Sequence, residues 1–142
     1  MMKKTAILFL CLALVGTVWA QVSQKKVQSN ASIHVFWERF RDAVTKGDKM
    51  VVANLSQFPI AMPYGIRTIR NNAQLIRRYR DVFNGETNAA KCFREVRPEV
   101  NPDNPAEFTV ACKNAAGDEV VIYSFASTRN GWKFKGLDNL NE

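Results

Sequence analysis

The chain has 142 residues with 20 Lys or Arg, 13 Asp or Glu and one His, and its formal net charge is +7. This length suits a single domain, and the moderate basic excess implies some attraction to anionic surfaces. A lone histidine, with no CxxC pair and no clustered ligand set, excludes a structural zinc site and indicates that no metal or other cofactor is used.

The N-terminus has the pattern of a secretory signal peptide. Two lysines precede an uncharged run over residues 5–18, and Val18 and Ala20 place small residues three before and one before a cut. We therefore predict cleavage after Ala20 and export to the periplasm or beyond. A membrane anchor is the alternative, but a membrane span needs about 20 apolar residues and this uncharged run is shorter. Lipidation is disfavoured because Cys11 follows bulky side chains.

Export also affects which partners are expected and whether the cysteines form a disulfide. An exported chain without an aromatic–basic motif is a poor candidate for binding nucleic acid. Two cysteines remain after cleavage, Cys92 and Cys112, and an even count in an exported domain suggests a disulfide. A closed loop of about 20 residues would contribute roughly 3 kcal/mol of stability. Two buried free thiols are the alternative.

Helices are expected to follow a polar tail. Residues 21–31 lack periodicity and are interpreted as a mobile segment, so residues 32–142 form the predicted domain. A helix should begin near Ser32, a good N-cap, and end at Gly47. Its apolar side chains recur at helical spacing and predict one buried stripe: Ile33, Phe36, Trp37, Phe40 and Val44. Asp48 can cap a second, short helix.

The stretch 58–83 is predicted to form a hairpin and then an amphipathic helix. Strands at 58–62 and 66–70 flank a turn at 63–65, and a helix capped by Asn71 or Asn72 continues to Gly85. This stretch is basic because of five arginines: Arg67, Arg70, Arg77, Arg78 and Arg80. A solvated helix face is the simpler interpretation of these arginines. An anion-binding patch is the other, and the absence of an acidic residue between Arg67 and Arg80 supports it.

The remaining residues predict four antiparallel strands, at 91–98, 107–113, 119–128 and 132–138. Asn130-Gly131 favours a two-residue hairpin loop, which would place Tyr123 opposite Asp138. The preceding hairpin would place Val110 opposite Tyr123, and a Cys92–Cys112 bond would place Arg94 opposite Val110. One inner face then forms a predicted ligand pocket lined by Arg94, Val110, Tyr123, Phe125, Trp132, Phe134 and Asp138. Ile122, Lys133, Lys135 and Leu137 would lie on the outer face.

Tyr123 and Asp138 are the candidate catalytic residues in that pocket. An aspartate beside a tyrosine on an apolar face is costly unless it is used, so Asp138 could act as a base or ligand anchor and Tyr123 as a hydrogen-bond donor. The favoured alternative places Asp138, which is near the C-terminus, at the open end of the sheet in water. A one-residue slip would also separate the two residues.

The order of these elements resembles the nuclear transport factor 2-like superfamily. The resemblance covers most of residues 32–138 and is carried by residues 36–55, 58–83 and 131–139. It implies an α+β fold of order α-α-β-β-α-β-β-β-β, in which a strongly curved antiparallel sheet wraps around helices as a cone with a pocket. Members include isomerase-like and dehydratase enzymes and binding domains without catalysis. The histidine–aspartate pair of some enzymes is missing, because His34 is the only histidine.

Three functions follow as hypotheses. The first is a non-catalytic exported domain that binds a small molecule or an envelope component in the cone. The second is a protein-interaction or inhibitor module, acting as a homodimer or on an envelope partner through the outer face or the arginines. The third is an acid–base isomerase or dehydratase with Asp138 as base and Tyr123 as oxyanion donor.

Overall fold

The computed structural model describes residues 18–63 and 67–140, with side chains from residue 32 onward. Most of the predicted signal peptide and part of the predicted turn at 63–65 therefore lie outside the described residues. Five helices and five strands are described: α1 (Val18–Lys46), α2 (Lys49–Asn54), β1 (Ser56–Ala61), α3 (Asn72–Arg77), α4 (Tyr79–Phe83), α5 (Ala89–Glu95), β2 (Glu99–Val100), β3 (Glu107–Lys113), β4 (Val120–Thr128) and β5 (Gly131–Asn139).

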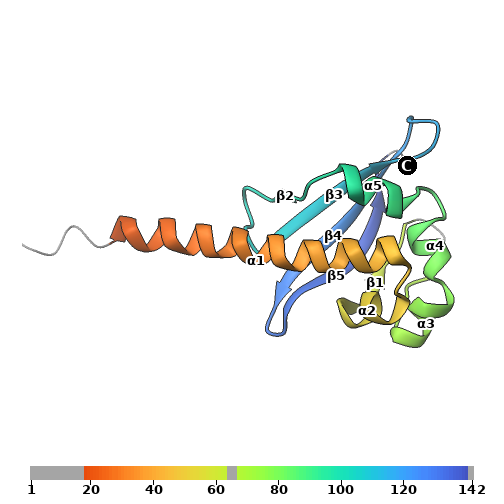
Figure 1. Cartoon of the computed structure of the whole chain (residues 1–142), viewed down its shortest axis with the longest axis horizontal. Coiled ribbons are helices and arrows are strands. Elements are labelled where there is room, and N and C mark those ends of the chain that lie inside the picture. The colour runs from red at the N-terminus through yellow and green to blue at the C-terminus, as the bar shows by residue number, and fades with distance from the viewer. Residues whose placement is uncertain (1–17, 64–66, 141–142) are drawn as a thin grey trace, which may run out of the picture.

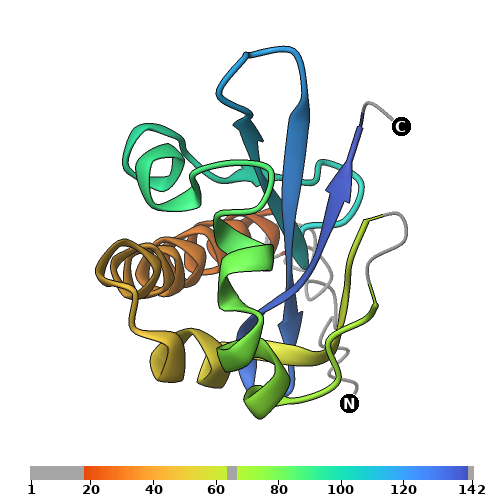
Figure 2. The ribbon, with the colours of Figure 1, turned by 90° about the vertical axis from the view of Figure 1, so that its right-hand side faces the viewer.

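The fold is α+β, as predicted, with the helices on one face of a sheet of order β1-β5-β4-β3-β2 (Figures 1 and 2). The strands from β2 to β5 pair antiparallel with their neighbours. β1 pairs with β5 in parallel, so the expected fully antiparallel sheet is wrong at this edge. A parallel pair needs a long crossover between its strands, and α3, α4, α5 and the other strands lie between β1 and β5.

α1 begins at Val18, so the predicted start of the helix near Ser32 is wrong and the backbone of residues 21–31 is helical. This segment contains no Gly or Pro and is rich in Gln and Lys, which favour helices. Its N-terminal part projects beyond the sheet (Figure 1). Ser32 is not a cap, and its Oγ instead accepts a hydrogen bond from Trp132 Nε1 at 3.1 Å.

Three other predicted elements differ. The strand predicted at 91–98 is mostly α5, because Asn88 caps a helix by accepting a hydrogen bond from the Lys91 amide at 2.9 Å. The hairpin strand at 66–70 is reduced to one antiparallel bridge between Ile60 and Ile69. Further on, the single helix expected after Asn71 is divided at Arg78 into α3 and α4.

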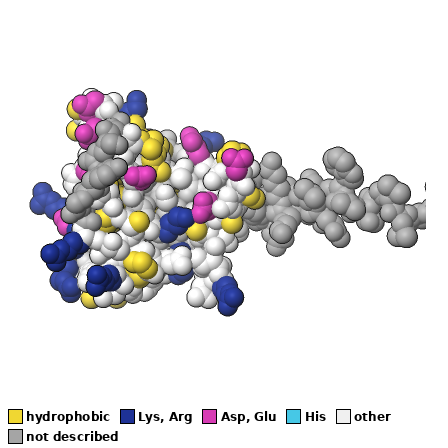
Figure 3. Space-filling model, turned by 180° about the vertical axis from the view of Figure 1, so that it is seen from behind, with side chains coloured by type: hydrophobic (Ala, Val, Ile, Leu, Met, Phe, Trp, Pro, Cys, Tyr) yellow, Lys and Arg dark blue, Asp and Glu magenta, His cyan; other side chains and the backbone are white. Residues whose placement is uncertain are grey.

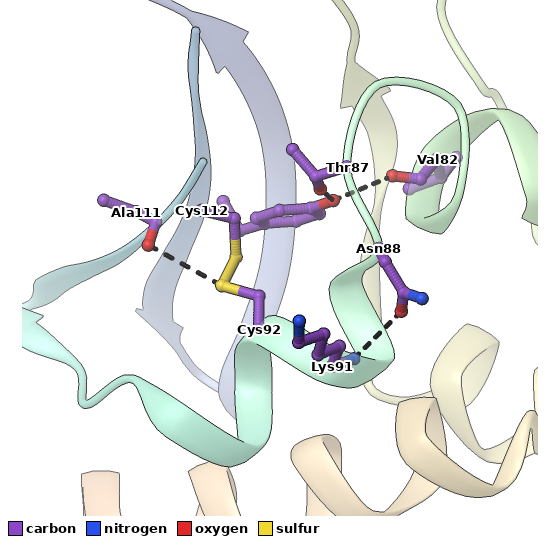
Figure 4. The surroundings of a disulfide bond; sticks show 8 residues. Val82, Thr87, Asn88, Lys91, Cys92, Ala111 and Cys112 are labelled. Atoms are coloured by element: carbon purple, nitrogen blue, oxygen red, sulfur yellow. Dashed lines mark hydrogen bonds between the residues drawn. A yellow bond between two sulfur atoms is a disulfide. The ribbon is translucent and has the colours of Figure 1, made fainter. Parts of the chain in front are cut away.

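The Cys92–Cys112 disulfide is present, as predicted, and joins α5 to β3 across a Cα–Cα distance of 5.8 Å (Figure 4). Because Cys92 lies on a helix, the disulfide joins a helix to the sheet and does not join two neighbouring strands. A disulfide is compatible with an oxidising, exported compartment. Among the described helices, none has both the length and the apolarity needed to cross a membrane.

The core lies between the helices and the inner face of the sheet. α1 supplies the predicted stripe, and each of its five members is at most 8% exposed. Phe40 is central, since its ring contacts those of Phe83, Phe93, Phe125 and Phe134 at centroid distances of 5.1–6.3 Å. Aromatic rings in such contacts contribute both buried area and geometric preference.

Candidate functional site

The interior in which a ligand pocket was expected is filled by aromatic side chains. Phe108 stacks on Phe125 with ring centroids 4.5 Å apart, and Tyr123 meets Phe93 edge-on at 5.0 Å. Seven of the largest side chains in the core are less than 2% exposed: Tyr123, Phe40, Phe83, Phe93, Phe108, Phe125 and Phe134. Of the predicted pocket, Val110, Tyr123, Phe125, Trp132 and Phe134 are therefore core residues that pack on one another.

The register of the last hairpin explains why Asp138 is not among them. The β3–β4 register is as predicted, with Val110 opposite Tyr123. The β4–β5 register is not: Thr128 pairs with Gly131, so the turn lies one residue earlier than Asn130-Gly131. An irregularity between Ser124 and Phe125 then shifts the pairing again. A bulge inserts one extra residue and changes which side chains share a face.

As a result, Leu137 and Asp138 exchange the faces that the sequence predicted for them. Leu137 lies opposite Tyr123 and is 8% exposed, whereas Asp138 lies opposite Ile122 and is exposed to solvent. The Asp138 carboxylate accepts a hydrogen bond from the Asn139 amide at 3.0 Å. The predicted row that contained Tyr123 and Asp138 is therefore wrong, and the expectation of Asp138 in water holds. Arg94 lies on α5 and is exposed.

Tyr123 has a structural role on the inner face. Its hydroxyl donates to the Val82 carbonyl oxygen at 3.2 Å and lies 3.0 Å from Thr87 Oγ1 (Figure 4). Burial raises the pKa of Tyr123 well above its usual value. A buried, neutral phenol with both hydrogen-bonding roles occupied has no free donor for a substrate. The Tyr123–Asp138 pair is thus not arranged for acid–base catalysis.

A groove opens on the other face of the sheet, where β1 and β5 meet. Its volume is about 550 Å³, and it is lined by Gln57, Phe58, Pro59, Ala61, Met62, Ser124, Lys135, Gly136, Leu137 and Asp138. We call it the outer-face groove. The two strands approach closely at Gly136, where a Cβ atom would lie 3.1 Å from the Ala61 Cβ and 3.2 Å from the Ala61 carbonyl oxygen. A side chain at this position would be closer than an ordinary contact and would require β1 to move by a few tenths of an ångström.

The polar groups of the outer-face groove differ in charge and in the strands from which they come. The Lys135 ammonium forms an ion pair with the Glu107 carboxylate at 2.7 Å, so its charge is largely offset. Ser124 and Asp138 belong to β4 and β5, and Gln57 belongs to β1. The apolar side chains come from Phe58, Pro59 and Met62, because the Leu137 side chain faces Tyr123 on the inner face of the sheet. Polar and apolar groups therefore both line the groove.

Most of the predicted anion patch is exposed. Arg67, Arg70, Arg77 and Arg80 are exposed, and Arg78 is partly buried. Arg78 Nε pairs with the Asp81 carboxylate at 3.1 Å, and its Nη1 donates to the Arg67 carbonyl oxygen at 2.7 Å. Arg78 therefore holds the local fold, and the other four are available to solvent. In the described parts of the chain, no group of three or more His, Cys, Asp or Glu could hold a metal ion.

The sequence did not reveal the outer-face groove. Pro59 and Phe58 were assigned to a hairpin strand, and nothing in their spacing indicates a parallel partner almost eighty residues later. Parallel pairing leaves no local turn signal, unlike an antiparallel hairpin. The one available hint was Gly136 inside a strand, because an isolated glycine there often marks a bulge or a close approach of another backbone.

Comparison with solved structures shows which known fold this architecture has. A protein from Novosphingobium aromaticivorans, described as NTF2-like with a cystatin-like fold, superposes with a TM-score of 0.54 at 13% identity, covering 91% of this chain and 93% of its own. The chain has the nuclear transport factor 2-like fold. A hexachlorocyclohexane dehydrochlorinase (LinA) of type 2 shares it, with a TM-score of 0.51 at 13% identity over 84% of this chain and 90% of that one.

No protein-family description matches the sequence, and no curated protein matches it. At 13% identity the structural similarity shows the fold alone. The nuclear transport factor 2-like fold carries enzymes as well as proteins that are not assigned an activity. Function must therefore be argued from the site, because one fold hosts many unrelated activities.

Proposed function

We propose that this nuclear transport factor 2-like chain is a non-catalytic, exported binding domain that takes a small molecule in the outer-face groove. One observation carries the proposal: the interior is filled by aromatic rings, whereas about 550 Å³ of space is open between β1 and β5. This volume lies within the range of about 300–1,000 Å³ that is usual for ligand sites.

The lining supports binding more than catalysis. Phe58 and Met62 offer apolar contact, while Ser124 and Asp138 offer a hydroxyl and a carboxylate. Each polar group is exposed or half-buried. A catalytic acid or base usually needs a pKa perturbed by burial or by a charged neighbour. Solvated groups of this kind are better suited to orienting a ligand.

The proposal is tested by screening small molecules against the full chain by thermal shift and then by NMR. Compounds that bind should raise the melting temperature and perturb the signals of residues 57–62, 124 and 135–138. Ser124→Phe should abolish binding by placing a ring in the groove. Thr109→Phe is the matched control, because Thr109 pairs with Ser124 on the same sheet face without lining the groove.

The outcomes separate the alternatives. Compounds that bind wild type and Thr109→Phe but not Ser124→Phe support the groove. Ligands that perturb only core residues such as Phe40 would instead support a pocket in the cone and overturn the proposal. Turnover of a bound compound that is lost in Asp138→Asn would show an enzyme and would overturn the non-catalytic assignment.

A further inference from the structure

Four exposed arginines lie on two neighbouring segments, and we call them the arginine patch: Arg67, Arg70, Arg77 and Arg80. Two hydrogen bonds place the segment at 67–70 alongside α3. The Arg70 amide donates to Gln74 Oε1 at 2.8 Å, and Arg78 Nη1 donates to the Arg67 carbonyl oxygen at 2.7 Å. The arginine patch therefore combines side chains from two neighbouring segments. In Figure 3, Lys and Arg side chains gather at the end of the molecule formed by α3 and α4.

The charge of the arginine patch is not compensated by the described residues. The nearest ion pair joins Arg78 to Asp81, and none of the four patch guanidinium groups pairs with another described side chain. Arg77 ends α3 and Arg80 lies in α4, three residues further along the chain, and like charges at short separation repel each other. An anion bound across the patch would remove this repulsion, so binding and stability should be linked.

The chemistry of the patch favours oxyanions presented along a chain. All its cations are arginines, whose planar guanidinium groups bind phosphate, sulfate or carboxylate with paired hydrogen bonds. The groups are exposed and spread over two segments, which suits several anions in series more than one enclosed ion. Among the residues whose side chains the structure describes, the exposed large apolar ones are Val35, Met50, Val100 and Leu140, and none belongs to the patch. A bilayer surface would normally engage such side chains as well as the charges.

We propose that the arginine patch binds a linear anionic polymer bearing phosphate, sulfate or carboxylate groups. Arg78 is a positioning residue in this surface, because it joins the 67–70 segment to α4 through the Arg67 carbonyl and the Asp81 carboxylate. The patch shares no residue with the outer-face groove. Binding of the polymer is therefore independent of the small-molecule proposal.

The test measures binding of the full chain to immobilised heparin, polyphosphate and polyglutamate over a range of salt concentrations. The patch variant replaces Arg67, Arg70, Arg77 and Arg80 with Gln and keeps Arg78. The matched control replaces four other exposed basic residues with Gln, Lys91, Arg97, Lys113 and Arg129, which gives the same change in net charge. Circular dichroism and the melting temperature of both variants confirm folding.

We expect the patch variant to lose at least about tenfold in affinity for one or more polymers, and the control to stay within about twofold. The dependence of log K on log salt should also become shallower in the patch variant, because a protein that makes fewer contacts with the polymer releases fewer counterions when it binds. The polymers should raise the melting temperature of wild type and not of the patch variant. The polymer that binds best identifies the preferred oxyanion.

Two results would overturn the proposal. Equal losses in the patch and control variants would mean that net charge, and not the patch, determines binding. Failure of wild type to bind any of the polymers at about 0.15 M salt, where surface charges are screened beyond about 8 Å, would exclude a specific site. A parallel measurement uses vesicles with anionic lipid: binding to vesicles alone, lost in the patch variant, would assign the surface to a membrane instead.

Discussion

At the scale of single residues, two buried tyrosine hydroxyls, those of Tyr79 and Tyr123, serve the folded state. Tyr123 is 1% exposed, and its hydroxyl lies between Thr87 and the Val82 carbonyl. Tyr79 is 6% exposed, and its hydroxyl donates at 3.3 Å to the Val44 carbonyl, which also accepts from the Gly47 amide at 3.1 Å. Each buried phenol therefore has a hydrogen-bond partner, without which its burial would cost free energy.

These tyrosines predict a loss of stability at alkaline pH. Burial, with a smaller effect of Asp48, raises the pKa of Tyr79 from 10.0 to about 12, and burial also raises the pKa of Tyr123. The folded state thus keeps protons that the unfolded chain releases above pH 10. Their contribution is fully present below pH 10, and the free energy of unfolding falls as pH rises through 10 to 12, by about 1.4 kcal/mol per unit per tyrosine.

Urea denaturation between pH 8 and pH 12 measures this dependence. Lysines also titrate in this range, so the comparison is between wild type and the variants Tyr79→Phe and Tyr123→Phe. Each variant is expected to be less stable at neutral pH by about 1 kcal/mol and to lose stability less steeply above pH 10. Identical slopes in all three proteins would contradict the raised pKa values.

At the scale of elements, β5 decides what reaches each face of the sheet. The irregularity opposite Ser124 and Phe125 reverses the alternation, so that Leu137 faces Tyr123 and Asp138 faces Ile122. Side chains in a strand alternate with a period of two, and a single inserted residue therefore exchanges the core and solvent positions beyond it. This exchange moves Asp138, one of the two catalytic candidates of the predicted pocket, into the outer-face groove.

The two registers make opposite predictions for neighbouring substitutions. In the structure, Leu137→Ala should lower the free energy of unfolding by about 2–3 kcal/mol, because the side chain is buried on the inner face. Asp138→Ala should change it by less than about 0.5 kcal/mol, because the side chain is exposed. Urea denaturation of both variants compares them directly, and a larger effect at Asp138 would favour the uninterrupted register.

At the scale of the whole molecule, the cone is a packed core. Rings from α1, α4, α5, β3, β4 and β5 meet around Phe40 and Phe125, and the space inside the sheet is used for stability. The outer face of the sheet carries the groove, and the end formed by α3 and α4 carries the arginine patch. The two proposed binding surfaces thus lie outside the core, which leaves the core free to be optimised for packing alone.

A packed cone predicts a specific response to truncation at its centre. Phe40→Ala should cost about 3–5 kcal/mol and leave a cavity lined by aromatic rings. Small aromatic compounds such as indole should then raise the melting temperature of the variant and not that of wild type, because an apolar cavity binds apolar molecules. Val35→Ala is the control on the same helix, since Val35 is 70% exposed. Equal stabilisation of wild type by indole would reveal an interior pocket.

Local patterns determine much of this protein from sequence alone. The stripe of Phe36 and Phe40 on α1, the α+β class and the disulfide follow from helical spacing, strand alternation and an even cysteine count. The β3–β4 register also follows, because Val110 and Tyr123 lie on strands joined by a short connection. In these cases neighbours in sequence are neighbours in space, so short-range rules suffice.

Only the tertiary structure decided where a ligand could bind. The parallel pairing of β1 with β5 joins segments from distant parts of the chain, and no turn sequence between them indicates the pairing. The irregularity in β5 exchanges Leu137 and Asp138. Gly136 beside it is a local hint of a bulge, but the glycine alone does not determine which residues pair across the two strands. Whether the cone is hollow depends on the sum of many side-chain volumes, and here the rings around Phe40 fill it. Non-local packing therefore moved the candidate site from the inside of the cone to its outer face.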